Sequence, residues 1–152
     1  MNVYDLINAD FANITSRVTV VAATDDTPAV GFIVVGTDSP QYLAEADRQR
    51  AEGQAYRRAA NKDATLKIDT DTDEGQAKFQ KRVDANLLGS AAACTVGWFG
   101  FTQKSDVDGK PVAVPFDQAI LTQMLVKKKS WRDAIIKALD EDARFLPQPA
   151  KN

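Results

Sequence analysis

Few side chains in this sequence could take part in bond chemistry or bind a metal ion. Asp69, Asp71 and Asp73 have the alternate spacing that begins a calcium-binding loop, in which carboxylate oxygens ligate the ion. Such a loop also needs glycine at its sixth position and a bidentate glutamate at its twelfth, but Glu74 and Gln80 stand there. We therefore interpret the segment as a solvated acidic turn that leads into the N-terminus of a helix.

The sequence contains no histidine and one cysteine, Cys94. It therefore lacks the side chain most often used for acid–base work near neutral pH and the commonest transition-metal ligand. One thiol excludes an internal disulfide and a multi-cysteine metal cluster, and its apolar surroundings predict that it is buried and inert. Asp140, Glu141 and Asp142 should splay apart on a helix, so they cannot jointly flank a bond. We expect no enzyme activity, no metal and no cofactor.

Composition and length predict one domain of ordinary globular type. The chain has 152 residues, of which 44% are hydrophobic, and its net charge is -2. A general nucleic-acid binder needs a concentrated excess of Lys and Arg, and no apolar run approaches the length that spans a bilayer. The first residues lack the basic and apolar regions of a secretory signal. We expect a cytoplasmic protein that binds neither nucleic acid nor membrane.

Two short β-branched runs near the start of the chain predict a hairpin. They cover about 17–23 and 30–37, and the turn-forming segment 24–29 separates them. A lone two-stranded hairpin is marginal in water, so it must pack on helices or pair with another chain. Residues 3–13 fit either a short helix or a further strand.

Four helices are predicted after this hairpin, each with its own start signal. Ser39 and Pro40 suit the cap and the first position of one helix, and Asp117 suits the cap of another. Ser130 is expected to cap the last helix, with Asp133 returning a bond to it. The expected ranges are about 40–60, 73–96, 117–128 and 130–145. The predicted fold is α+β, mainly helical, with a small N-terminal antiparallel hairpin and a flexible tail over 146–152.

The two long helices differ in their apolar faces. In helix 73–96, apolar residues recur at helical spacing and should face the core. They are Phe79, Val83, Leu87, Leu88, Ala91 and Cys94. Helix 40–60 has only a thin apolar stripe beside Arg50, Arg57 and Arg58. Such a helix is either a solvated surface element or gains its packing from a partner, and its arginines could bind an acidic group.

Trp98, Phe99 and Phe101 concentrate aromatic side chains within four positions. In a small domain aromatic residues usually lie in the core. Their flanking glycines and the polar loop after them also fit an exposed anchor, because Trp and Phe are common in interface hot spots. Both interpretations remain open at this point.

Five motifs, in order, resemble those of the tail assembly chaperones of long-tailed, siphovirus-type bacteriophages. The segment 35–42 (Val-Gly-Thr-Asp-Ser-Pro-Gln-Tyr) resembles their passage from strand to helix, and 88–100 resembles an alanine-rich helix ending in Val-Gly-Trp-x-Gly. Pro-Phe at 115–116, Trp-Arg-Asp at 131–133 and the ending 143–147 resemble their closing segments. Together these motifs cover most of the chain after Val30.

The resemblance implies a non-catalytic late protein of the host cytoplasm that is absent from the mature virion. Its implied partners are the phage tape measure protein and the tail tube protein, together with self-association. It also implies a longer frameshifted form, and Ala150 to Asn152 is compatible with a slippery gene sequence. The alternative is a structural tail or head–tail connector subunit that stays in the particle.

The motif residues divide into expected scaffold and expected contact residues. We expect the scaffold to include Ser39, Pro40, Pro115, Phe116, Trp131 and Phe145. We expect partner contacts on the basic helix, the hairpin and the Trp98 region, with candidates Arg50, Arg57, Arg58, Trp98, Phe99 and Phe101.

Overall fold

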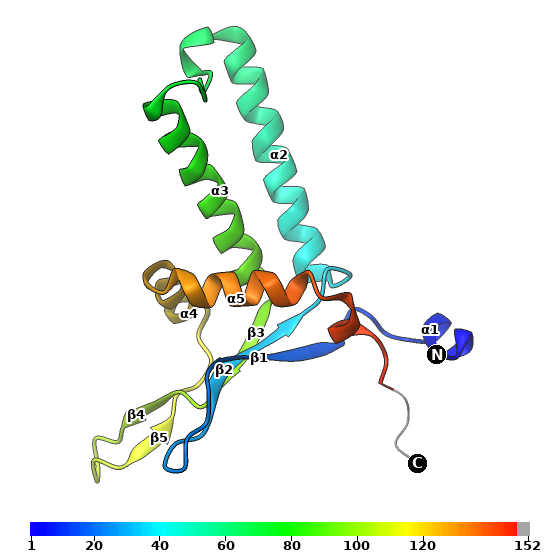
Figure 1. The fold of residues 1–152 in the computed structure, drawn as a ribbon, viewed down its shortest axis with the longest axis vertical. Coiled ribbons are helices and arrows are strands. Elements are labelled where there is room, and N and C mark those ends of the chain that lie inside the picture. Colours follow the sequence, from blue (N-terminus) through cyan, green and yellow to red (C-terminus); the bar gives the residue numbers. More distant parts are fainter. Residues whose placement is uncertain (149–152) are drawn as a thin grey trace.

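A computed structural model describes residues 1–148 of the chain. At its centre is an antiparallel sheet in the order β1 (Thr15–Val21), β2 (Val30–Val35) and β3 (Thr95–Phe99). Helix α5 (Lys129–Leu139) lies across one face of this sheet, and three elements project from this centre (Figure 1). The predicted α+β fold class, mainly helical with a small antiparallel sheet, is confirmed.

The predicted hairpin is present, although its first strand lies two residues nearer the N-terminus and its second strand ends two residues earlier than predicted. Val18 of β1 pairs with Phe32 of β2, which in turn pairs with Trp98 of β3. Side chains alternate across a strand, so this row points to one face of the sheet, where Val18 and Phe32 are buried beneath α5. Pairing with β3 and cover by a helix supply the packing that an isolated hairpin lacks.

Strand β3 is a correction to the predicted helix 73–96. Helix α3 (Asp73–Cys94) ends at Cys94, and the chain enters the sheet at once. The hydroxyl of Thr95 donates a 2.7 Å hydrogen bond to the carbonyl of Ala91, which satisfies one of the free acceptors at the end of the helix. The β-branched Thr95 and Val96 then favour the extended backbone.

Helices α2 (Pro40–Lys62) and α3 stand side by side and project from the sheet, joined at the tip by the short 3-10 helix η1 (Ala64–Leu66) (Figure 1). We call this helical hairpin, residues 40–94, the arm. Ser39 starts α2 as predicted, since its hydroxyl accepts from the backbone N–H of Tyr42 at 3.2 Å. Thr72 starts α3 by the same device, accepting from the N–H of Gly75 at 3.0 Å.

The closing helices are α4 (Gln118–Lys127) and α5. The predicted cap on α4 is confirmed, because the Asp117 carboxylate accepts from the N–H of Ile120 at 2.9 Å. The predicted cap on α5 is wrong. Lys128 alone joins the two helices, so Ser130 is already helical, and Asp133 binds Arg132 instead.

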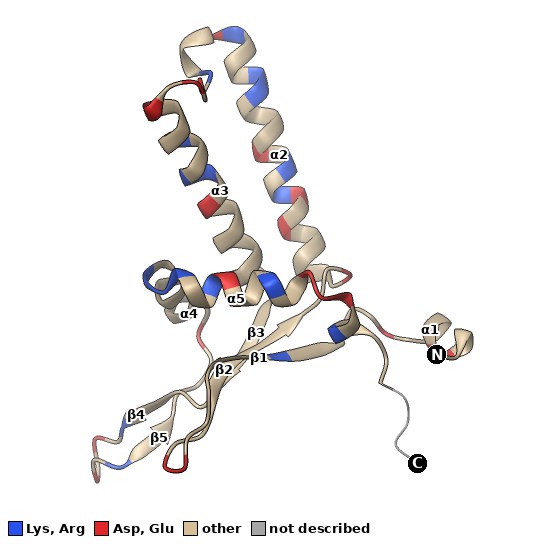
Figure 2. Cartoon of the chain, in the orientation of Figure 1, with Lys and Arg blue, Asp and Glu red and all other residues tan. Residues whose placement is uncertain are grey.

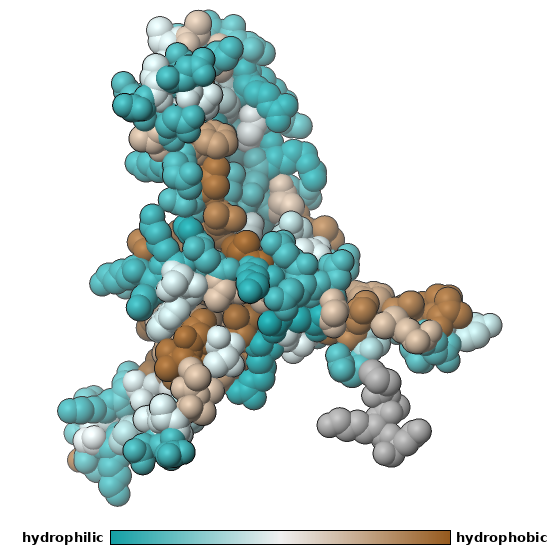
Figure 3. All heavy atoms as spheres, in the orientation of Figure 1, coloured by the Kyte–Doolittle hydropathy of each residue, from teal (hydrophilic) through white to brown (hydrophobic). Residues whose placement is uncertain are grey.

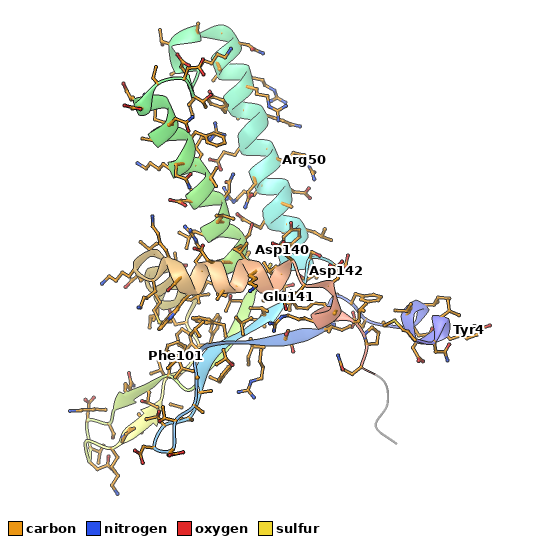
Figure 4. The ribbon with its side chains drawn as sticks, viewed as in Figure 1. Tyr4, Arg50, Phe101, Asp140, Glu141 and Asp142 are labelled. Atoms are coloured by element: carbon orange, nitrogen blue, oxygen red, sulfur yellow. The ribbon has the colours of Figure 1, made fainter. Side chains whose placement is uncertain are left out.

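The last helix is also shorter than predicted. It ends at Leu139, and a separate 3-10 turn, η2 (Asp142–Phe145), follows it. Asp140, Glu141 and the start of η2 therefore form a turn at the C-terminal end of α5 (Figure 4), where we had expected continuous helix. Of the predicted flexible tail, residues 149–152 lie outside the described part, and Leu146 and Pro147 are half-buried.

Two small projections complete the fold, and the first of them was not predicted. Strands β4 (Thr102–Lys104) and β5 (Pro111–Ala113) pair as an antiparallel hairpin that extends away from the arm (Figure 1). A turn containing Asp108 and Gly109 closes it, with Gly109 at a φ of 69°. At the N-terminus, where helix and strand were both open, the short helix α1 (Val3–Ile7) forms.

The buried apolar side chains all gather where the sheet, α4, α5 and the base of α3 meet. They are Val18, Phe32, Val34, Val35, Ala91, Cys94, Leu121, Leu125, Ile135, Ala138, Leu139 and Phe145. We call this region the junction. Phe79, which was predicted to face the core, lies outside the junction and is 50% exposed.

Candidate interaction surfaces

Trp98 and Phe101 belong to an aromatic cluster within the junction. The ring of Trp98 lies 5.4 Å from that of Phe101 and 5.1 Å from that of Phe116, measured between centroids. Phe101 in turn contacts Phe32 at 5.6 Å and Trp131 at 5.9 Å. The indole N–H of Trp98 donates to the carbonyl of Val114 at 2.7 Å. These rings connect β2 and β3 with α5 and with the segments that precede β4 and α4; Figure 4 labels Phe101.

Phe99 lies on the opposite, uncovered face of the sheet. The guanidinium of Arg17 sits 3.9 Å above the centre of its ring, which is within cation–π range. The ring also covers Gly31, where an added Cβ would lie 2.7 Å from its edge. Phe99 is half-buried by these contacts within its own chain.

Residues of separate family-like motifs contact each other at the junction. Phe145 packs on the backbone of Gly36, where an added Cβ would lie 2.7 Å from its ring. Ser39 is fully buried, and Trp131 packs against Phe32 at 6.0 Å. Phe116 packs on Trp98, so all five motifs contribute a residue to these contacts. Pro40 occupies the first turn of α2, and Pro115 precedes the start of α4.

The three candidate arginines of α2 have different surroundings. Arg50 points away from α3 (Figure 4) and pairs with Asp47 at 2.6 Å. Arg57 lines a groove between the two helices of the arm, whereas Arg58 is exposed and does not line it. The structure therefore separates two adjacent arginines that the sequence alone could not distinguish.

The arm is held together by polar contacts rather than by a hydrophobic core. No residue of α2 is buried against any part of the described chain. Gln49 donates to the carbonyl of Asn86 and to the hydroxyl of Ser90, both at 3.0 Å. At Gly89 an added Cβ would lie 2.2 Å from a carboxylate oxygen of Glu45, so the helices approach closely at this level.

Nearer the tip of the arm, a cation–π contact joins α2 and α3 in place of the hydrogen bonds of Gln49. The guanidinium of Arg82 lies 4.2 Å over the ring of Tyr56, whose hydroxyl accepts from the N–H of Ile68 at 2.8 Å. A groove opens on each side of this stack. The larger, about 540 Å³, includes Glu52, Leu66 and Lys81, and the smaller, about 360 Å³, includes Gly53, Arg57, Phe79 and Val83.

Local ion pairs support the exposed surface of the arm. Arg48 binds Glu45 and Glu52, each at 2.7 Å, and Lys78 binds Glu74 at 3.0 Å. Such pairs contribute about 0.2–0.5 kcal/mol each to a helix. Figure 2 shows charges of both signs along the arm, whereas the three-stranded sheet is mostly uncharged.

Two titratable groups at the base of the arm have shifted pKa values. A hydrogen bond from Arg48 lowers the pKa of Glu45 below its ordinary 4.5, against the opposing effect of partial burial. Burial raises the pKa of the Cys94 thiol to about 12, and the nearby charge of Glu45 acts in the same direction. At neutral pH, Glu45 is therefore ionised and Cys94 is a neutral thiol.

Helix α1 exposes apolar side chains at the end of the N-terminal segment. Val3, Tyr4 and Ile7 are 58%, 69% and 71% exposed, and Tyr4 points away from the body of the molecule (Figure 4). Sequence reasoning missed α1 as a candidate surface. The sequence does contain an indication of this surface, because several apolar residues precede Asn8 and no neighbouring segment has an apolar pattern that would cover them.

The acidic segment 69–73 forms the turn before α3. Asp69 accepts from the N–H of Asp71 at 3.0 Å, and Thr72 donates to the carbonyl of Asp69 at 2.9 Å. Among residues 1–148, the structure brings together no group of three histidine, cysteine or carboxylate side chains that could hold a metal ion. None of the helices it describes is both long and apolar enough to cross a membrane.

Comparison with known proteins identifies no relative of this chain. No protein-family model, curated protein sequence or solved structure matches the chain. The assignment of function therefore depends on the sequence motifs and on the surfaces described above.

Proposed function

We propose that this chain is a non-catalytic phage tail assembly chaperone that binds the tape measure protein and assists assembly of the tail tube. The observation that carries the proposal is the arm. Helix α2 has 23 residues, and none of them is fully buried within the described chain; Tyr42 at its base packs against the junction. Since helices in proteins gain most of their stability by packing an apolar face, an element of this length that packs so little is suited to a partner.

The family-like motifs support this division of roles. Phe145, Trp131 and Ser39 lie at the junction, and the exposed ring of Phe116 packs on Trp98, so these motif residues belong to the scaffold. The arm, α1 and the β4–β5 hairpin project from that scaffold (Figure 1). A rigid centre with projecting, weakly packed elements suits a protein that keeps a long helical partner in solution during assembly.

Co-expression with the tape measure protein of the same genome tests the proposal. We expect the tape measure protein to move from the insoluble to the soluble fraction when this chain is present, and to co-purify with it. An equally insoluble tape measure protein with and without this chain would contradict the proposal. Sequencing the codons of Ala150 to Asn152 tests the frameshift separately, because an AAG lysine codon removes the proposed slippery site.

A structural subunit of the virion is the second candidate. The observation that favours it is the sheet, whose outer face is uncovered and whose strands β1 and β3 form its two edges in the described chain. Free sheet edges pair readily with other chains. Mass spectrometry of purified virions separates the two functions: we expect no peptides of this chain, and stoichiometric amounts would identify a structural subunit.

A further inference from the structure

The smaller groove of the arm has the features of a binding site for a helix. It lies between α2 and α3 on one side of the Tyr56–Arg82 stack and has a volume of about 360 Å³. We call it the distal groove. Its main lining residues are Gly53, Tyr56, Arg57, Phe79, Arg82 and Val83.

An apolar stripe runs from the distal groove toward the junction. Phe79, Val83 and Leu87 recur every four residues on α3, so they share one side of the helix. Phe79 is 50% exposed, and the other two are half-buried. The stripe is about 12 Å long, which corresponds to about two helical turns. Figure 3 shows an apolar column along the otherwise hydrophilic arm.

The charge of the distal groove is of one sign. Arg57 and Arg82 line it, and no Asp or Glu does so. Within residues 1–148, neither arginine has a carboxylate within ion-pair distance. The larger groove on the other side differs, because Glu52 is part of its lining. The distal groove therefore favours a partner that carries carboxylates beside an apolar surface.

Gly53 gives a separate argument for an external occupant. A glycine inside a helix costs about 1 kcal/mol relative to alanine. An added Cβ at Gly53 would meet no atom within 4 Å, so no packing contact in the described chain requires glycine at this position. The glycine leaves the side of the groove open where another backbone or side chain would approach.

We propose that the distal groove binds one amphipathic helix of a partner protein. The apolar face of that helix lies on Phe79, Val83 and the open space at Gly53, and its flanking carboxylates lie toward Arg57 and Arg82. Helices bound in this way use apolar anchors three and four residues apart. The proposal rests on the proposed function only for the partner's identity, which would then be the tape measure protein.

Paired variants of the full-length chain test the site. Gly53→Leu fills the groove and Arg57→Glu reverses its charge. Their matched controls on the same helix are Ala55→Leu and Arg58→Glu, at exposed positions that do not line the groove. Helix content measured by circular dichroism establishes that each variant folds before binding is compared.

Two probes are used with these variants. The first is the tape measure protein in the co-expression assay, and the second is a fluorescent helical peptide of about three heptads with a leucine face flanked by glutamates. We expect Gly53→Leu and Arg57→Glu to weaken peptide binding by about tenfold or more, and the controls by less than about twofold. A twin peptide with lysines in place of the glutamates should bind about tenfold more weakly than the glutamate peptide.

The outcomes separate the site from the function. Equal binding by groove variants and controls, or equal binding of both peptides, would overturn the site. Self-association of the wild-type chain that Gly53→Leu abolishes would also overturn it, because the occupant would then be a second copy. Groove-dependent peptide binding without solubilised tape measure protein supports the site and contradicts the proposed function. If this chain solubilises the tape measure protein and Gly53→Leu does not change that effect, the result supports the proposed function and contradicts the site.

Discussion

The junction and the arm are built from different kinds of contact within one continuous chain. At the junction, fully buried Phe32, Leu121 and Ile135 pack among aromatic rings. In the arm, Gln49 and the Tyr56–Arg82 stack join the two helices, and no residue of α2 is fully buried within the described chain. Because burial of apolar surface is the main favourable term in folding, the junction should carry the stability and leave the arm available for binding.

The largest expected difference is in the cost of removing an aromatic ring. Phe32→Ala should lower the free energy of unfolding by about 3–5 kcal/mol, because it empties a fully buried site that contacts Phe101 and Trp131. Phe79→Ala in the arm should cost less than about 1 kcal/mol, since that ring is half exposed. Urea unfolding of both variants measures the two values. Similar losses would show that the arm is as well packed as the junction.

The rate of thiol alkylation gives a second comparison between the junction and the arm. The pKa of Cys94 is raised from its ordinary 9.0 to about 12, which lowers the thiolate fraction at neutral pH about a thousandfold. A cysteine introduced by Ala55→Cys on the exposed side of α2 should keep ordinary reactivity. We expect iodoacetamide to modify it much faster than Cys94 in the native protein, because Cys94 is both fully buried and protonated. Comparable rates would mean that the base of α3 opens readily.

Local start signals explain most of what the sequence predicted correctly. Ser39 and Asp117 cap their helices through bonds to backbone groups three residues away, so neighbouring residues alone determine these starts. The hairpin followed from two β-branched runs in the same way. The predicted cap at Ser130 is wrong because α4 ends at Lys127 and α5 begins at Lys129. Ser130 therefore has helical backbone and cannot act as the cap residue.

The features that were not predicted from the sequence depend on contacts between distant parts of the chain. The stripe of Phe79, Val83 and Leu87 was predicted to face the core, but periodicity shows only which side of a helix is apolar, not what covers it. Strand β3 was missed because its residues continue the apolar pattern of α3, and its pairing with β2 involves residues more than sixty positions apart. Similarly, only the fold distinguishes Arg57, which lines the distal groove, from Arg58 beside it.

A smaller effect of opposite sign is expected at Gly53. Gly53→Ala should raise the stability of the arm by about 0.5–1 kcal/mol, because alanine restricts the unfolded chain and its methyl group would enter open space. Hydrogen exchange of the α2 and α3 amides reports this gain in the arm. A loss of protection would show that the space beside Gly53 is filled by the chain itself, and it would remove one argument for the distal groove.

The smallest expected effect concerns acid and the base of the arm. The pKa of Glu45 is lowered in the folded state, chiefly by its bond with Arg48, so the unfolded chain binds this proton more readily. Its contribution to stability is therefore complete above its ordinary pKa of 4.5 and is lost as pH falls through the lower folded value. Between about pH 7 and about pH 3, the wild-type arm should lose more protection from exchange than Glu45→Gln. Parallel pH profiles for the two proteins would show that this contact does not stabilise the arm, which would leave Gln49 and the Tyr56–Arg82 stack to hold its helices together.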